Sequence, residues 1–330
     1  MKKIFALLLS AALLVTLLAA CGGGNTTDTD TDAQEPATDA STTQVEEQEP
    51  DTGDASKDDP LNQDEIGEKE LLVVSFGTSY NDSRRETIGA IEKAMQTAFP
   101  DYSVRRAFTS QIIIDHVKDR DGVTIDNVEQ ALERAVNNGV KTLVVQPTHL
   151  MNGLEYEELT DELAKYSDSF EKIAIGDPLL TSDADFEAVM TAITDATKDA
   201  ADGKTAICFM GHGTTADSNT VYSKMQTLLT DKGFNDYYVG TVEATPSLYD
   251  VLAAVQKGNY EKVILRPLMI VAGDHANNDM AGDEDDSWKS TFEKAGYTVD
   301  CQVEGLGQLE AIQQLFVEHA KAAVASAEAE

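Results

Sequence analysis

Residues 208–225 read CFMGHGTTADSNTVYSKM, in which an apolar run ends at a histidine between two glycines and a helical pattern follows. The first half of the chain holds a counterpart, because VVSFGTS at residues 73–79 lines up with FMGHGTT at residues 209–215. This alignment places Phe76 opposite His212 and Thr78 opposite Thr214. Repetition on this scale predicts a duplicated unit.

A second pair of stretches supports the duplication. KTLVVQPTHLMNGLEY at residues 141–156 lines up with EKVILRPLMIVAGDHA at residues 261–276, which places Glu155 opposite His275. Short β-rich runs alternate with helical patterns through both halves, and this alternation is typical of parallel sheets covered by helices on both faces. The sequence therefore predicts two similar α/β lobes, residues 70–202 and residues 203–330, of which only the second has histidines at the matched positions.

The chain begins with MKKIFALLLSAALLVTLLAAC, two lysines followed by a short apolar run and small residues before Cys21. This layout is typical of a secretory signal, and LAAC at residues 18–21 resembles a bacterial lipobox. We interpret residues 1–20 as a lipoprotein signal peptide and Cys21 as the lipidation site. The protein is then exported and anchored to a membrane, at the cell surface or in the periplasm. An ordinary signal peptide or an uncleaved anchor is the alternative.

Residues 21–69 are rich in Asp, Glu, Thr and Ser and contain almost no large apolar residue. Such a composition cannot bury enough surface to offset the entropy of ordering a chain, so we predict an acidic disordered tether. The whole sequence has 59 acidic and 25 basic side chains, a net charge of −34. This excess argues against a nucleic-acid partner and raises the local concentration of cations.

Three side chains that bind metals follow successive predicted strands of the second lobe. His212 comes after AICFM, Glu243 is the last residue of YYVGTVE, and His275 comes directly after VILRPLMIVAGD. Glu243 lies 31 residues after His212, and His275 lies 32 residues after Glu243. The carboxyl ends of parallel strands meet at one edge of a sheet, where ligands bind. Two imidazoles and a carboxylate suit Co²⁺, Ni²⁺, Fe²⁺ or Zn²⁺. Taken singly, each histidine is better explained as a structural residue, but the three together predict a metal site.

The matching edge of the first lobe offers candidate substrate-binding residues. Arginine suits carboxylates because its donors form a fork, although most arginines here are better explained as exposed ion-pair partners. These candidates are Ser75, Thr78, Arg84, Arg85 and His149. His149 is better explained as a hydrogen-bonded histidine behind the site than as a residue that lines the cleft. The acidic loop HANNDMAGDEDDSWK at residues 275–289 is explained either by favourable charge at a helix start or by a funnel for cations.

Several separated motifs resemble one known family. The stretches similar to it are LLVVSFGTSYNDSRRETIGAIE, RDGVTIDNVEQAL, VVQPTHLMNGLEYEEL, FMGHGT and MIVAGDHANNDMAGDEDDSWK. They resemble the anaerobic sirohydrochlorin cobaltochelatases, the CbiK group of class II chelatases. The resemblance implies a ferrochelatase-like fold, two similar α/β lobes of parallel sheets flanked by helices, with a tetrapyrrole cleft between the lobes.

The resemblance also implies an activity. A member of this group inserts Co²⁺ into the tetrapyrrole sirohydrochlorin without ATP or NAD, and it holds the metal at positions matching His212, Glu243 and His275. His212 and His275 are then the catalytic residues, with His212 as the proton acceptor. Fe²⁺, Ni²⁺ and Zn²⁺ are further candidate metals, and a homo-oligomer is expected.

Export fits poorly with a biosynthetic enzyme of the cell interior. The alternative function is therefore an exported lipoprotein that binds metal, haem or another tetrapyrrole and delivers it to a transporter. A surface lipoprotein with a vestigial site is the third possibility, which the intact set of His212, Glu243 and His275 disfavours.

Overall fold

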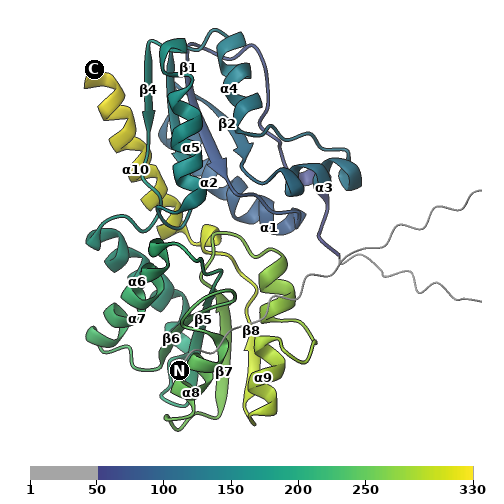
Figure 1. Cartoon of the computed structure of the whole chain (residues 1–330), viewed down its shortest axis with the longest axis vertical. Coiled ribbons are helices and arrows are strands. Elements are labelled where there is room, and N and C mark those ends of the chain that lie inside the picture. Colours follow the sequence, from purple (N-terminus) through teal and green to yellow (C-terminus); the bar gives the residue numbers. More distant parts are fainter. Residues whose placement is uncertain (1–50, 330) are drawn as a thin grey trace, which may run out of the picture. The chain divides into compact units, whose positions relative to one another are not determined.

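The computed structural model describes residues 51–329, and they form two lobes that are each built on a four-stranded sheet (Figure 1). In the N-terminal lobe the strand order is β2-β1-β3-β4, and each pairing is parallel. Its strands are β1 (Lys69–Ser75), β2 (Ser103–Phe108), β3 (Thr142–Pro147) and β4 (Lys172–Ile175). Its helices are α1 (Asn81–Glu86), α2 (Ile88–Ala98), α3 (Gln111–Asp121), α4 (Val128–Asn137) and α5 (Leu154–Ala164).

The C-terminal lobe repeats this arrangement with the order β6-β5-β7-β8, again parallel throughout. Its strands are β5 (Thr205–Gly211), β6 (Tyr237–Thr241), β7 (Lys262–Pro267) and β8 (Thr298–Cys301). Its helices are α7 (Thr220–Asp231), α8 (Leu248–Val255), the π-helix η5 (Ala276–Met280) and α9 (Trp288–Lys294). The predicted pair of similar α/β lobes is confirmed.

Strand β5 shows why the sequence folds this way. Every residue of β5 is buried, so the strand needs cover on both faces. Alternate side chains point to opposite faces: Phe209 belongs to the apolar cluster that includes Tyr222 of α7, and Met210 to the cluster that includes Val251 of α8 and Trp288 of α9. The continuous apolar run is therefore that of a central strand in a sheet with helices on both faces.

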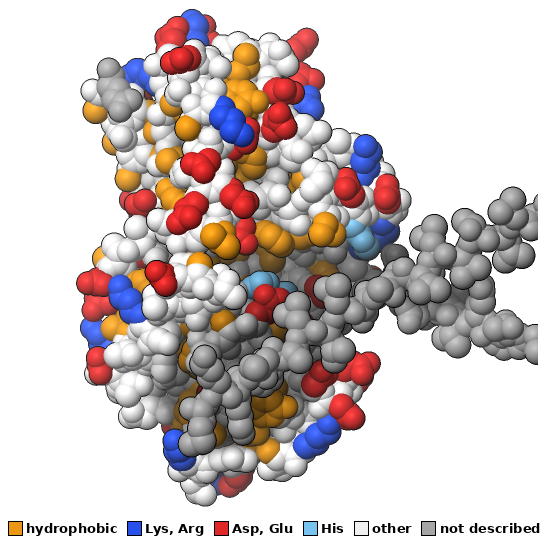
Figure 2. All heavy atoms as spheres, in the orientation of Figure 1, with side chains coloured by type: hydrophobic (Ala, Val, Ile, Leu, Met, Phe, Trp, Pro, Cys, Tyr) orange, Lys and Arg blue, Asp and Glu red, His pale blue; other side chains and the backbone are white. Residues whose placement is uncertain are grey.

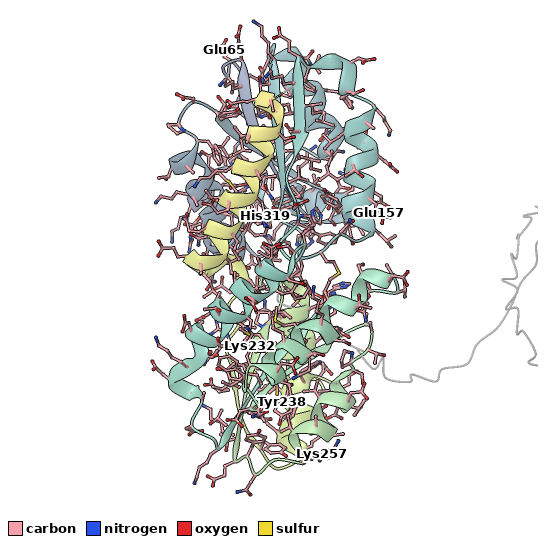
Figure 3. The ribbon with its side chains drawn as sticks, turned by 90° about the vertical axis from the view of Figure 1, so that its left-hand side faces the viewer. Glu65, Glu157, Lys232, Tyr238, Lys257 and His319 are labelled. Atoms are coloured by element: carbon pink, nitrogen blue, oxygen red, sulfur yellow. The ribbon has the colours of Figure 1, made fainter. Side chains whose placement is uncertain are left out.

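Two helices pack against the lobe opposite to the one whose strands they follow in the sequence. Helix α6 (Asp183–Thr197) follows β4 but packs beside α7, and α10 (Glu310–Ala329) ends the second half but packs against β3, β4 and α2 (Figure 1). His319 of α10 (Figure 3) lies with Nδ1 3.1 Å from the carbonyl oxygen of Asp177 and Nε2 3.0 Å from Oδ1 of Asp185 at the start of α6. The predicted boundary at residues 202 and 203 thus separates the two sheets, while the last helix belongs with the N-terminal lobe.

Residues 51–68 precede β1 and lie against the N-terminal lobe, although the sequence analysis placed them in the tether. The carboxylate of Asp58 is only 5% exposed, because Arg84 and Arg106 both bind it, and Leu61 is part of the apolar core. We call residues 51–61 the N-terminal strap. The acidic composition hid this segment because its attachment depends on contacts with distant residues, namely the ion pairs of Asp58 and the burial of Leu61.

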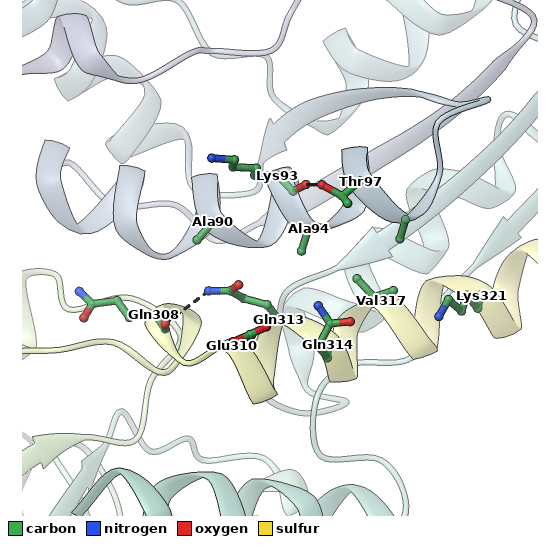
Figure 4. A pocket seen from close by; sticks show the side chains of 11 residues that line it. Ala90, Lys93, Ala94, Thr97, Gln308, Glu310, Gln313, Gln314, Val317 and Lys321 are labelled. Carbon is green, nitrogen blue, oxygen red and sulfur yellow. Dashed lines mark hydrogen bonds between the residues drawn. The ribbon is translucent and has the colours of Figure 1, made fainter.

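The predicted signal peptide, the predicted lipidation site Cys21 and the first part of the predicted tether lie outside the described residues. None of the helices between residues 51 and 329 combines the length and the apolarity that a bilayer span requires. A groove of about 650 Å³ lies between α2 and α10 (Figure 4), lined by small and polar side chains such as Ala94, Thr97 and Gln314. None of the candidate site residues lines this groove.

Candidate metal centre

The three predicted metal ligands meet at the carboxyl ends of neighbouring strands. His212 directly follows β5, Glu243 lies two residues after β6, and His275 lies between β7 and the π-helix η5. One donor atom from each side chain lies within 4.8 Å of the other two. The two imidazole rings are edge to face, with centroids 4.7 Å apart, and Nδ1 of His212 is 4.0 Å from Oε2 of Glu243. The arrangement suits a single divalent cation.

These side chains are open to solvent. The exposed fractions are 48% for His212, 56% for Glu243 and 31% for His275. Figure 2 shows a histidine at the surface between the lobes, with acidic side chains beside it and apolar side chains on the edge of the N-terminal lobe that faces it. Among residues 51–329, the three donors are therefore accessible to a hydrated cation.

The glycines that flank His212 are needed by the turn that presents it. A Cβ on Gly211 would overlap the ring of Tyr222, whose hydroxyl oxygen accepts a hydrogen bond from the backbone N–H of Gly213 at 3.3 Å. Gly213 has φ +90°, a conformation that other residues rarely adopt, and a Cβ there would lie 2.9 Å from Ala244. The backbone N–H of Glu243 donates to the carbonyl oxygen of His212 at 2.9 Å, so the same turn also places the carboxylate.

Hydrogen bonds set the tautomers of both histidines. Nδ1 of His212 lies 2.7 Å from the carbonyl oxygen of Gly213, and a carbonyl oxygen can only accept, so Nδ1 carries the proton in the neutral ring. Nδ1 of His275 lies 2.8 Å from Oδ2 of Asp279 and donates to this carboxylate. Both rings therefore keep the lone pair of Nε2 for a metal or a proton.

Asp279 is a candidate site residue that the sequence alone did not single out. It was included only in the acidic loop, as part of a possible funnel. In the structure it lies four residues after His275 in the turn formed by η5, and its carboxylate orients the imidazole, as carboxylates often do behind metal-binding histidines. The i, i+4 spacing of histidine and aspartate after a predicted strand was the available signal.

Two other carboxylates of the acidic loop form exposed ion pairs. Asp283 contacts Lys289 and Asp285 contacts Lys294, both over 2.6 to 2.7 Å, and neither aspartate bonds to a histidine. These lysines hold the pKa of each aspartate below its usual range. Of the carboxylates in this loop, Asp279 is the one that contacts a candidate metal ligand, and the funnel stays a prediction.

Three of the predicted substrate-binding residues are buried and hydrogen-bonded within the protein. Ser75 Oγ pairs with Thr148 Oγ1 at 2.7 Å, and Thr78 Oγ1 accepts from the backbone N–H of Tyr80 at 3.2 Å. The guanidinium of Arg84 is fully buried and donates to Asp58, Asn81 and the carbonyl oxygen of Thr78. These contacts argue against substrate binding by the three side chains and assign them to the support of the lobe.

Arg85 and His149 differ from that group. Arg85 is partly exposed and forms ion pairs with Asp82 and Glu86 on the surface of α1. His149 as a whole is half-buried, but both of its ring nitrogens are buried. Neither nitrogen has a hydrogen-bond partner among the described residues. Burial lowers the pKa of His149 to about 4, against a small opposing effect of Glu155, so the ring is neutral at pH 7.

The chain is similar to proteins of known activity. The chain is 38% identical over 251 residues to the sirohydrochlorin cobaltochelatase of Salmonella typhimurium, covering 76% of this chain and 94% of that protein. It is 29% identical over 260 residues to sirohydrochlorin cobaltochelatase CbiKC of Nitratidesulfovibrio vulgaris, covering 78% of this chain and 91% of that protein.

Solved structures share the fold at lower identity. SirB from Bacillus subtilis with Fe³⁺ matches with a TM-score of 0.57 at 14% identity, over 80% of this chain and 98% of that one. The sirohydrochlorin chelatase SirB from Bacillus subtilis subspecies spizizenii in complex with cobalt matches with a TM-score of 0.54 at 15% identity, over the same shares. A family model described as cobalt chelatase (CbiK) matches residues 69–325. The chain belongs to the CbiK family of cobalt chelatases.

Proposed function

We propose that this protein inserts Co²⁺ into sirohydrochlorin without ATP, with Fe²⁺ or Ni²⁺ as possible alternative substrates. The observation that carries the proposal is the set of His212, Glu243 and His275, whose donor atoms lie within 4.8 Å of one another in a member of the cobalt chelatase family. Two imidazoles and one carboxylate bind first-row divalent cations without the thiolates that would hold them too tightly for transfer.

Insertion exchanges one divalent cation for two pyrrole protons, so the site needs both a metal ligand and a proton acceptor. His275 has the carboxylate of Asp279 behind it, which raises the electron density at Nε2 and favours metal binding. His212 has only a carbonyl oxygen as partner, and Glu243 lies 4.0 Å away to stabilise the imidazolium that proton transfer creates. We therefore assign His275 mainly to the metal and His212 to the protons, with Glu243 serving both.

The alternative is a binding protein that captures metal or tetrapyrrole for a transporter, and the lipobox before Cys21 favours it. Turnover separates the two functions, because they share the same residues. The test is to mix the full chain at substoichiometric amounts with sirohydrochlorin and Co²⁺, Fe²⁺ or Ni²⁺ and to follow the absorption spectrum of the tetrapyrrole. Many metallations per protein molecule, lost in His212→Ala, support the enzyme; a single equivalent of bound ligand without release supports the carrier.

We further propose that the protein is exported, anchored to a membrane through lipidated Cys21, and assembled as a homo-oligomer. The lipobox supports the anchor, and the family resemblance supports the oligomer. Metabolic labelling with a fatty acid tests the lipid anchor, because a protein that takes up no label would contradict lipidation of Cys21. Light scattering of detergent-purified protein tests the homo-oligomer, since a monomeric mass contradicts it.

A further inference from the structure

We propose that the N-terminal strap is a positioning element for the metal centre: through Asp58 it fixes helix α1, and α1 holds the loop that carries His275. The strap precedes the region matched by the family model, which begins at residue 69, so nothing in the family assignment accounts for it. The proposal rests on the proposed function only in taking His275 as a metal ligand.

Helix α1 needs support from outside itself. Its C-terminal end continues through Thr87 into α2, but at its N-terminal end Tyr80, the N-cap, provides no side-chain hydrogen bond for the first backbone N–H groups. The strap supplies what is missing. The backbone N–H of Asp82 donates to the carbonyl oxygen of Thr52 at 2.9 Å, and the side-chain amide of Asn81 donates to the carbonyl oxygen of Gly53 at 3.1 Å.

Asp58 adds a buried charge that α1 requires. Its carboxylate accepts from Nε of Arg84 at 2.6 Å and from two nitrogens of Arg106 at 2.7 and 3.0 Å. Burial acts to raise the pKa of Asp58, but the hydrogen bonds and charges of Arg106 and Arg84 outweigh it and hold the pKa below its usual range. Without Asp58, Arg106 would keep the carboxylate of Glu92, but Arg84 would keep only the neutral oxygens of Asn81 and Thr78 as hydrogen-bond partners. Arg84 would then have to move, and α1 with it.

The other side of α1 holds the loop that leads to His275. Ser83 Oγ accepts a hydrogen bond from the backbone N–H of Ala272 at 2.9 Å, three residues before the histidine. Arg84 donates to the carbonyl oxygen of Thr78 at 3.1 Å, and Thr78 packs so closely on Gly273 that a Cβ added there would lie 3.0 Å from its hydroxyl oxygen. Asp58 is therefore linked to this loop by two chains of contacts. One runs through Arg84 and Thr78 to Gly273, and the other runs through helix α1 and Ser83 to Ala272.

The test uses the full chain, purified in one detergent, with Asp58→Asn as the variant and Asp54→Asn as the matched control. Asp54 lies in the same strap and loses the same charge, but it is exposed and contacts only its neighbours. In Asp58→Asn, hydrogen exchange of residues 268–281 should speed up by about fivefold or more, while β5 and β7 keep their protection. Co²⁺ should bind about fivefold more weakly, with the KM for sirohydrochlorin unchanged. Normal exchange of this loop in a folded Asp58→Asn protein would overturn the proposal.

A second variant covers the case in which Asp58→Asn does not fold. Ser83→Ala leaves the arginine cluster intact and removes only the hydrogen bond to Ala272, so it should loosen the same loop and weaken Co²⁺ binding. A protected loop in Ser83→Ala would equally overturn the proposal. Hydrogen exchange requires neither metal nor turnover, so a wild-type protein that fails to bind Co²⁺ refutes the proposed function without affecting this readout.

Discussion

Replacing Asp279 by alanine tests how the site orients His275. The hydrogen bond of 2.8 Å from Nδ1 to Oδ2 fixes the ring and leaves Nε2 for the metal. Loss of such a partner typically lowers metal affinity ten- to hundredfold, or about 1.4 to 2.7 kcal/mol. The carboxylate of Asp279 is 44% exposed, and solvent weakens its interaction with the ring. We therefore expect the lower end, a Co²⁺ Kd raised about tenfold.

The assay is a titration of the full chain with Co²⁺, followed by the visible absorption of the bound ion. Asp279→Asn keeps a hydrogen-bond acceptor without the charge and should fall between wild type and Asp279→Ala. The control is Asp274→Asn, because Asp274 is an exposed carboxylate of the same loop that bonds to Asn278 rather than to a histidine. An unchanged Kd in Asp279→Ala, or an equal loss in the control, would refute orientation of His275 as the cause.

Three further predictions concern the histidines and the N-terminus. His212→Ala should slow metallation of sirohydrochlorin by about a hundredfold or more without lowering the melting temperature, because the ring is exposed; normal turnover would remove it from the mechanism. Burial lowers the pKa of His149 from 6.5 to about 4. As the pH falls below 6.5, this histidine therefore binds a proton in the unfolded chain but stays neutral in the folded chain until the pH nears 4. The free energy of unfolding should thus drop by about 2 kcal/mol between pH 7 and pH 5, and His149→Gln should remove this part of the slope in chemical denaturation. Cys21→Ser should shift the protein from the membrane fraction to the soluble fraction, and continued sedimentation with membranes would contradict a lipid anchor.

The three candidate ligands were predictable because they depend on topology more than on packing. A strand that ends in a parallel sheet delivers the next residues to a known edge, whatever the surrounding side chains are. The strands before these ligands neighbour one another in the order β6-β5-β7. The shared edge at their carboxyl ends was therefore enough to predict that His212, Glu243 and His275 lie close together.

The roles of the arginines were not predictable, because burial depends on contacts between distant segments. Arg84 and Arg85 are adjacent in the sequence, yet α1 turns the first inward to Asp58 and leaves the second on the surface. Asp58 itself is one acidic residue in a strongly acidic segment. Nothing local distinguishes it from its neighbours, and only the two buried guanidinium groups show why it is held.

The repeated strand order of the two lobes bears on how a single active site can arise. If the two halves were identical separate subunits related by a twofold axis, every histidine would occur twice, and two cations would compete for one macrocycle. Joining the halves in one chain removes that constraint, because each half can then change alone. Here one half has Phe76 and Glu155 where the other has His212 and His275. Fusion thus lets one half carry the three candidate metal ligands while the other half keeps different side chains at the matched positions.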